Sequence, residues 1–325
     1  MLPFNGPDET APFKPQTSNL KQQMKIDFDK EEIAHHVGPS QIDIAYQQFG
    51  DSSNPPVFLI MGGGAQMIHW PDSFCESLVR HGLQIIRFDN RDTGHSTHIT
   101  DAPVPDLAAA MKGDYSTASY SLSDMASDTV GLMDFLGFDR VHLVGASMGG
   151  MIAQTIAIEY PGRVCSLTSI MSTTGNPAVG QTDFASLAHI GMPPQDDRQG
   201  FIEWSVRSLN AIGSTQYPLD EEAAADRAGR AWDRDHDPLG MLRQSVAVLK
   251  SGDRTELLKK LRVPALVIHG STDKMLHVSG GKATAQAIPG AKLQIIEEMG
   301  HGFPPALLDV FAHQIAQHVK NAEAT

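Results

Sequence analysis

The segment GASMG at residues 145–149 places a serine in the spacing Gly-x-Ser-x-Gly. This spacing is typical of a sharp turn that joins a strand to a helix and exposes the serine hydroxyl. The preceding residues RVHLV indicate a buried strand, and the following residues MIAQTIAIE indicate a helix. Ser147 is therefore a nucleophile or an ordinary helix cap. The residues that would have to accompany a nucleophile distinguish the two.

A serine hydroxyl attacks a carbonyl carbon when a base removes its proton and an acidic residue orients that base. After a turn of this kind, the acid and then the histidine follow along the chain. Asp273 follows the buried strand VPALVIHG, and His301 lies between two glycines in the loop after LQIIEE. Both positions are at carboxyl ends of strands, where open α/β sheets hold active sites. The sequence thus predicts a triad of Ser147, Asp273 and His301. The alternatives are a capping role for Asp273 and a solvated loop position for His301.

Other histidines compete for the role of base. His269 precedes Asp273 in the chain, so we expect it to be structural. His313 and His318 fall in the last predicted helix, where we expect surface positions.

Acyl transfer also needs hydrogen-bond donors for the oxyanion. We expect the N–H of Met148, directly after the serine, to be one donor. The second is expected from the glycine-rich loop MGGGAQM, with Gly63 as our choice and Gly64 as the alternative one residue later. A phosphate-binding role for these glycines has neither the GK[ST] nor the GxGxxG spacing.

Three residues in or just after this loop are candidates for lining the substrate pocket: Gly64, His69 and Trp70. For Trp70, packing against the core or a lid is an equally good interpretation.

Strands and helices alternate along most of the chain, and most strand segments are apolar throughout. Strand-like runs lie at 57–64, 83–96 (which ends in a polar loop), 140–145, 163–172, 263–270 and 291–298. Helical patterns lie at 70–82, 121–138, 148–162, near 279–288 and near 305–320. Ser121 and Asp124 have capping-box spacing at one helix start. The sequence predicts an α/β fold with a mainly parallel central sheet flanked by helices, and an antiparallel strand at 41–50 near its edge.

Residues 176–258 interrupt this alternation with helix-like charged segments and no buried-strand run. We expect a helical lid there, inserted into a core formed by residues 31–175 and 259–325. Residues 1–30, rich in proline and polar side chains at their start, are predicted to be a flexible arm.

These motifs resemble those of the α/β-hydrolase superfamily over about residues 35–320. The resemblance rests on GASMG, HGSTD and MGHGFP in that order, and on FDNRDTGHST, which is similar to the superfamily's D-x-R-G-x-G-x-S turn. That turn braces the sheet, which implies structural roles for Asp89, Arg91, Gly94 and Ser96. The segment MGGG…HWPDSFCESLVRHGLQIIRFDNRDTGHST is more closely similar to aclacinomycin methylesterase-like serine esterases.

The resemblance implies hydrolysis of small-molecule carboxylic esters through an acyl-enzyme, with no metal and no organic cofactor. The same triad serves thioesters, lactones, activated amides and some C–C bonds, and perhydrolysis is a side reaction of such sites. Some proteins of this fold bind ligands without catalysis. The residues leave these alternatives open.

The formal net charge of −13 argues against nucleic acid or an anionic membrane as a partner. The two cysteines, Cys75 and Cys165, form no CxxC motif and are expected to be buried free thiols. Neither a signal-peptide pattern nor a run of about 18 apolar residues occurs, so we expect a cytoplasmic protein. A homodimer remains an open alternative to a monomer.

Overall fold

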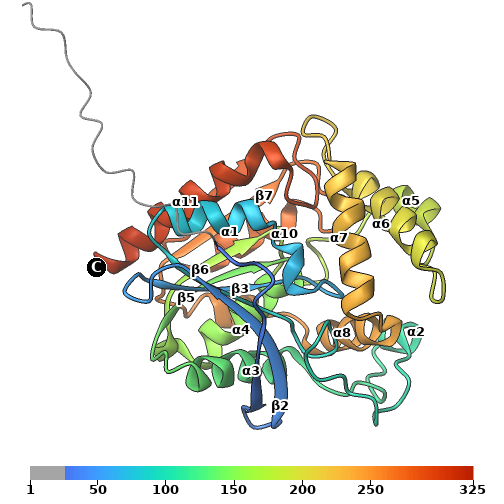
Figure 1. Ribbon diagram of the computed structural model, residues 1–325, viewed down its shortest axis with the longest axis horizontal. Helices are drawn as coiled ribbons and strands as arrows, with labels where there is room; N and C mark the ends of the chain where they lie inside the picture. Colours follow the sequence, from blue (N-terminus) through green and yellow to red (C-terminus); the bar gives the residue numbers. More distant parts are fainter. Residues whose placement is uncertain (1–25, 325) are drawn as a thin grey trace, which may run out of the picture.

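The computed structural model describes residues 26–324 (Figure 1). The part of the predicted arm before residue 26 lies outside the described residues. Eight strands form one sheet, in the order β1-β2-β4-β3-β5-β6-β7-β8, within this part of the chain. The strands are β1 (Glu32–Val37), β2 (Ile42–Phe49), β3 (Pro56–Ile60), β4 (Gln84–Phe88), β5 (Val141–Ala146), β6 (Val164–Ile170), β7 (Ala265–Gly270) and β8 (Lys292–Ile296).

In the order of the sheet, the six strands from β4 to β8, which include β3, are parallel to one another. Strand β2 pairs antiparallel with both β1 and β4. The predicted fold class, a mainly parallel α/β sheet flanked by helices, is confirmed. Strand β1 was not predicted, because the apolar residues of its sequence EIAHHV do not alternate with polar ones, and most of its side chains are exposed at the sheet edge.

Helices cover both faces of the sheet (Figure 1). Successive side chains of β3 point to opposite faces: Val57 and Leu59 pack toward α1 and α11, and Phe58 and Ile60 pack toward α3 and α4. The helices are α1 (Asp72–Arg80), α2 (Leu107–Ala110), α3 (Leu122–Phe135), α4 (Met148–Glu159), α5 (Phe184–Leu187), α6 (Arg198–Ile212), α7 (Glu221–Arg234), α8 (Pro238–Ser251), α9 (Thr255–Leu258), α10 (Ser279–Ala287) and α11 (Leu308–Glu323). Short 3-10 turns are η1 (Met67–His69), η2 (Pro161–Arg163), η3 (Ala188–Ile190) and η4 (Pro305–Leu307).

Residues 171–264, between β6 and β7, form the segment that we call the helical insertion. All of it is described, and it holds α5 to α9 and no strand. Figure 1 shows α5 to α8 gathered at one end of the sheet. No helix among residues 26–324 is long and apolar enough to cross a membrane.

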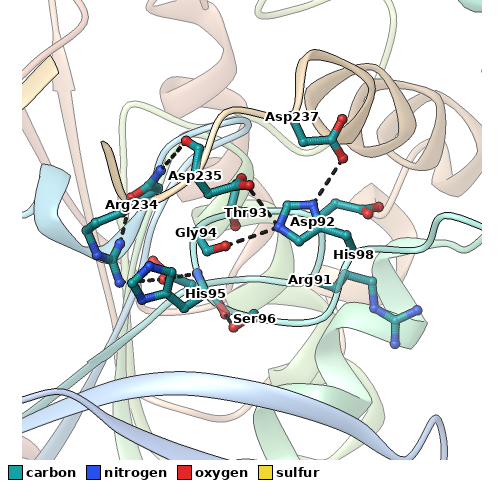
Figure 2. Close-up of polar contacts among 12 residues, drawn as sticks. Arg91, Asp92, Thr93, Gly94, His95, Ser96, His98, Arg234, Asp235 and Asp237 are labelled. Atoms are coloured by element: carbon teal, nitrogen blue, oxygen red, sulfur yellow. Dashed lines mark hydrogen bonds and ion pairs between the residues drawn. The ribbon is translucent and has the colours of Figure 1, made fainter. Parts of the chain in front are cut away.

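Buried and partly buried ion pairs join the helical insertion to the loop after β4, and Figure 2 shows those of His98. The guanidinium of Arg243 binds both oxygens of Asp92 at 2.9 Å. The ring of His98 faces Asp235 and Asp237, at 3.3 and 3.0 Å. Both of these acids belong to the insertion. These contacts make the loop a bridge between the sheet and the insertion.

Candidate active site

Ser147 lies at the turn between β5 and α4 in a backbone conformation that non-glycine residues rarely adopt, with φ 55° and ψ −121°. The flanking glycines are required by space. A Cβ on Gly145 would lie 2.1 Å from the carbonyl oxygen of Gly149, and one on Gly149 would lie 1.9 Å from that of Ile60. The Ser147 hydroxyl does not cap α4 and makes no hydrogen bond within residues 26–324. The turn therefore presents a free hydroxyl at the carboxyl end of the central strand.

The structure brings Asp273 and His301 together, and Nδ1 of His301 donates to Oδ2 of Asp273 at 2.8 Å. The other carboxylate oxygen accepts from the N–H groups of Met275 and Leu276. Burial alone would raise the pKa of Asp273, but the imidazoles of His301 and His269 and the N–H of Leu276 lower it to about 2. The carboxylate is therefore ionised and oriented toward the histidine at neutral pH.

His269 is fully buried at the end of β7, and its Nε2 lies 3.3 Å from Asp273 and 2.8 Å from the carbonyl of Leu276. It thus supports the carboxylate from within the protein interior.

The two N–H groups that the sequence suggested for an oxyanion belong to Gly63 and Met148, both of which line the same cavity as Ser147. In the described chain neither group donates to another protein atom. By contrast, the N–H of Gly64 donates to Oε1 of Gln244 at 2.7 Å, so it has no free donor for a ligand.

The cavity around Ser147 and His301 has a volume of about 590 Å³ and is mostly apolar. Several of its walls are methionines, which adapt their shape to different ligands: Met111, Met151, Met171, Met241 and Met275. His69 lines the cavity as expected, but Gly64 and Trp70 do not. The ring of Trp70 is instead fully buried and packs against Phe74 and Phe303, with centroids 5.6 and 5.0 Å away, so its alternative interpretation as a core residue is the one that the structure shows.

The family model for the alpha/beta hydrolase fold matches residues 55–304. This chain belongs to that family. Rhodomycin D methylesterase DnrP of Streptomyces peucetius is 26% identical over 306 residues, which cover 87% of this chain and 96% of that protein. A putative carbamate hydrolase, RutD of Variovorax paradoxus, is 22% identical, with 86% and 97% covered. The esterase RhEst1 from Rhodococcus sp. ECU1013 has the same fold, with a TM-score of 0.66, 21% identity, and 89% and 99% covered.

Two parts of this alpha/beta hydrolase that position the site were missed by sequence reasoning, and both belong to the helical insertion. Gln244 on α8 holds the glycine loop, because its side chain accepts from Gly64 and donates to the carbonyl of Arg91 at 2.8 Å. Ile212 at the end of α6 accepts from the N–H of His301 at 2.7 Å. No local pattern marks either contact, since each joins residues far apart in the chain.

His318 is also placed differently from the expectation, because its side chain is buried rather than on the surface. Burial lowers the pKa of His318 to about 4, so its ring is neutral at neutral pH. His313 is exposed, as expected.

The cysteines show no sign of a catalytic role. Cys75 is buried, and burial raises the pKa of its thiol to about 11.

Cys165 is only partly buried, so the expectation of a buried thiol is wrong for this residue. It lies beside His142 and Glu323 in a group of metal-ligand types. Both ring nitrogens of His142 already have partners there, Ser166 at 2.8 Å and Glu323 at 3.1 Å.

A second group of metal-ligand types is Asp92, His98 and Asp237. Arg243 supplies the positive charge between its two carboxylates, and Tyr120 donates to Asp92 at 2.6 Å. These groups therefore form a completed ion-pair network.

Proposed function

We propose that this protein is a serine esterase that hydrolyses carboxylic esters of small molecules through an acyl-enzyme. The observation that carries the proposal is the pairing of two features in one cavity. The first is the strained turn with the unbound hydroxyl of Ser147, and the second is the imidazole of His301 held by the buried carboxylate of Asp273. Activation of a serine requires a base that an acid orients and that the hydroxyl can approach, and Ser147 and His301 line one cavity.

In the proposed mechanism, Nε2 of His301 takes the proton from Ser147 while the serine oxygen bonds to the ester carbonyl carbon. Asp273 accepts from Nδ1, which keeps the ring in the tautomer that leaves Nε2 free and stabilises the imidazolium that forms. The leaving alcohol then receives that proton from His301. Water attacks the acyl-enzyme with the same histidine as base, and the acid product leaves.

The N–H groups of Gly63 and Met148 stabilise the oxyanion in this proposal. Both belong to backbone held in place before substrate binds, so they need no reorganisation during the reaction. Loss of one such donor costs about 10²- to 10³-fold in kcat in serine hydrolases.

Within the esterases, we favour a methyl ester or another ester of a small alcohol. The names of relatives support this choice, since DnrP is a methylesterase and RhEst1 is an esterase. The apolar cavity supports a bulky acyl group. The lid role of residues 176–258 and a cytoplasmic location stay predictions, and a homodimer stays an open alternative to a monomer.

The test is Ser147→Ala, compared with wild type for turnover of p-nitrophenyl acetate and of methyl esters. We expect abolished hydrolysis, no labelling by a fluorophosphonate probe, and an unchanged circular dichroism spectrum. Retained hydrolysis in the folded variant would overturn the assignment of the nucleophile. An inert wild type that the probe does not label would favour a ligand-binding protein instead.

A further inference from the structure

The described lining of the substrate cavity includes one permanently charged residue, Arg227 on α7. The side chain is partly buried and lines the same cavity as Ser147 and His301. Three other polar side chains of the wall donate to groups of the protein, in the pairs Asn210–Glu221, Ser214–Glu298 and Ser245–Met241. Arg227 therefore differs from them in having its hydrogen-bond donors available to a ligand.

Helix α7 carries three arginines on one face, at positions 227, 230 and 234. Arg230 lies 3.8 Å from Asp72, and Arg234 lies 2.8 Å from Asp89. By contrast, Arg227 makes no hydrogen bond with any residue in 26–324, and no carboxylate oxygen of these residues lies within 4 Å of its guanidinium. Asp72, the acid with the largest effect on Arg227, is already bound by Arg87 at 2.8 Å and shared with Arg230. Among the described residues, Arg230 and Arg234 thus each have an ion-pair partner, whereas Arg227 has none. The carboxylates of Asp72, Asp220 and Asp226 act on Arg227 only at longer range.

The electrostatic effect of Arg227 reaches the neighbouring wall of the cavity. The pKa of His69 is lowered to about 4, first by burial and then by the positive charge of Arg227. At neutral pH His69 is therefore uncharged and adds no second cation. Burial lowers the pKa of Arg227 itself, because a guanidinium that has lost water and lacks a partner is destabilised. Asp220, the N-cap of this helix, and Asp226 within it are exposed to water, which screens their charges.

We propose that Arg227 binds an anionic oxygen group of the substrate, so that the substrate is an ester carrying a second, ionised acid group. The inference rests on the proposed function, because the ester must reach Ser147 in the same cavity. A carboxylate accepts two parallel hydrogen bonds from a guanidinium, and a phenolate accepts one or two from the same donors. The protein's formal charge of −13 repels anions at long range, so a local cation is what would hold such a substrate.

The test compares esters of matched shape that differ in charge. Monomethyl adipate is paired with the methyl ester of adipic acid monoamide, and methyl 3,5-difluoro-4-hydroxybenzoate with its 4-methoxy analogue. For each pair the readout is the ratio of kcat/KM, charged over neutral, at a pH where the acid is ionised. The variants are Arg227→Gln, which removes the charge, and Arg227→Lys, which keeps it. Arg230→Gln is the matched control, since Arg230 lies on the same helix face but outside the cavity lining.

We expect wild type to prefer the charged member of at least one pair, and Arg227→Gln to lower that ratio about 10- to 100-fold, mainly through KM. Arg227→Lys should keep part of the preference, and Arg230→Gln should keep all of it. Preference in the first pair identifies a carboxylate, and preference in the second identifies a phenolate. A wild type without preference in either pair, or an equal loss of preference in Arg230→Gln, would overturn the inference. Turnover of p-nitrophenyl acetate separates the two proposals, because its absence in wild type would refute the esterase itself.

Discussion

Replacement of Arg243 by methionine tests whether the helical insertion is held to the core by a buried ion pair. Arg243 on α8 and Asp92 in the loop after β4 have side chains that are 5% and 0% exposed, and they share two hydrogen bonds of 2.9 Å. Removing one partner of a buried pair leaves an uncompensated charge, which typically costs about 3–5 kcal/mol. Tyr120 and the N–H of Ile99 still donate to Asp92 at 2.6 and 2.7 Å. We therefore expect a loss of about 3 kcal/mol, at the lower end of that range.

The assay is unfolding in urea, with the free energy of unfolding as readout. Arg198→Met is the control, because Arg198 binds Asp233 in the same bidentate way, at 2.7 and 2.6 Å, but with side chains 47% and 59% exposed. An exposed pair contributes under about 1 kcal/mol. A third variant, Asp92→Asn in the Arg243→Met background, removes the buried charge. Asparagine suits this position because the backbone φ of Asp92 is 64°.

The double variant should recover part of the lost stability, because a neutral amide is less costly to bury than an unpaired carboxylate. The reasoning fails if Arg243→Met costs no more than Arg198→Met. It also fails if the double variant is as unstable as Arg243→Met alone. In either case the Arg243–Asp92 pair would orient the insertion without adding to the free energy of unfolding, and apolar contacts would hold the insertion to the core.

Four further outcomes are expected. Asp273→Asn should lower kcat about 10³- to 10⁴-fold with little change in KM, measured with p-nitrophenyl acetate. Because the folded pKa of Asp273 is about 2, below its ordinary 3.8, its ionisation stabilises the fold above pH 4 and this contribution is lost as the pH falls toward 2. The loss, about 2 kcal/mol, should disappear from the acid-unfolding profile of Asp273→Asn. Gly145→Ala should unfold the protein or destabilise it by more than about 3 kcal/mol, whereas Gly162→Ala, where a Cβ meets no atom within 4 Å, should change thermal stability little. Gln244→Leu should lower kcat about tenfold while tryptophan fluorescence stays native, because the glycine loop loses its anchor.

Local patterns predicted the parts of the structure that depend on neighbouring residues. The strand, turn and helix around Ser147 follow from three local features. These are the apolar run of β5, two glycines without room for a Cβ, and the helix-forming residues of α4. The capping box of Ser121 and Asp124 is present at the start of α3 for the same reason. The order of Asp273 and His301 along a parallel sheet brought their side chains within 2.8 Å.

Contacts between distant segments were beyond the reach of these patterns. Gln244 is 180 residues from Gly64, and no periodicity relates the two. Trp70 follows the glycine loop closely, yet its ring is fully buried against Phe74 and Phe303, and the contact with Phe303 is tertiary packing that no local pattern marks. His318 was misplaced for a related reason. A polar residue on an amphipathic helix is expected to face water, but α11 buries this position against the sheet.

The helical insertion contacts the site at three separate points, and this has a consequence for how substrates are selected. Gln244 holds the glycine loop, Ile212 holds the backbone of His301, and Arg227 faces the cavity. A substitution that displaces the insertion would therefore move an oxyanion donor and the base as well as the cavity wall. Such a change should lower kcat and raise KM together. A substitution that only reshapes the wall, such as Met151→Leu on α4, leaves both anchors in place and should act through KM alone. Specificity and catalytic geometry are thus coupled through the insertion.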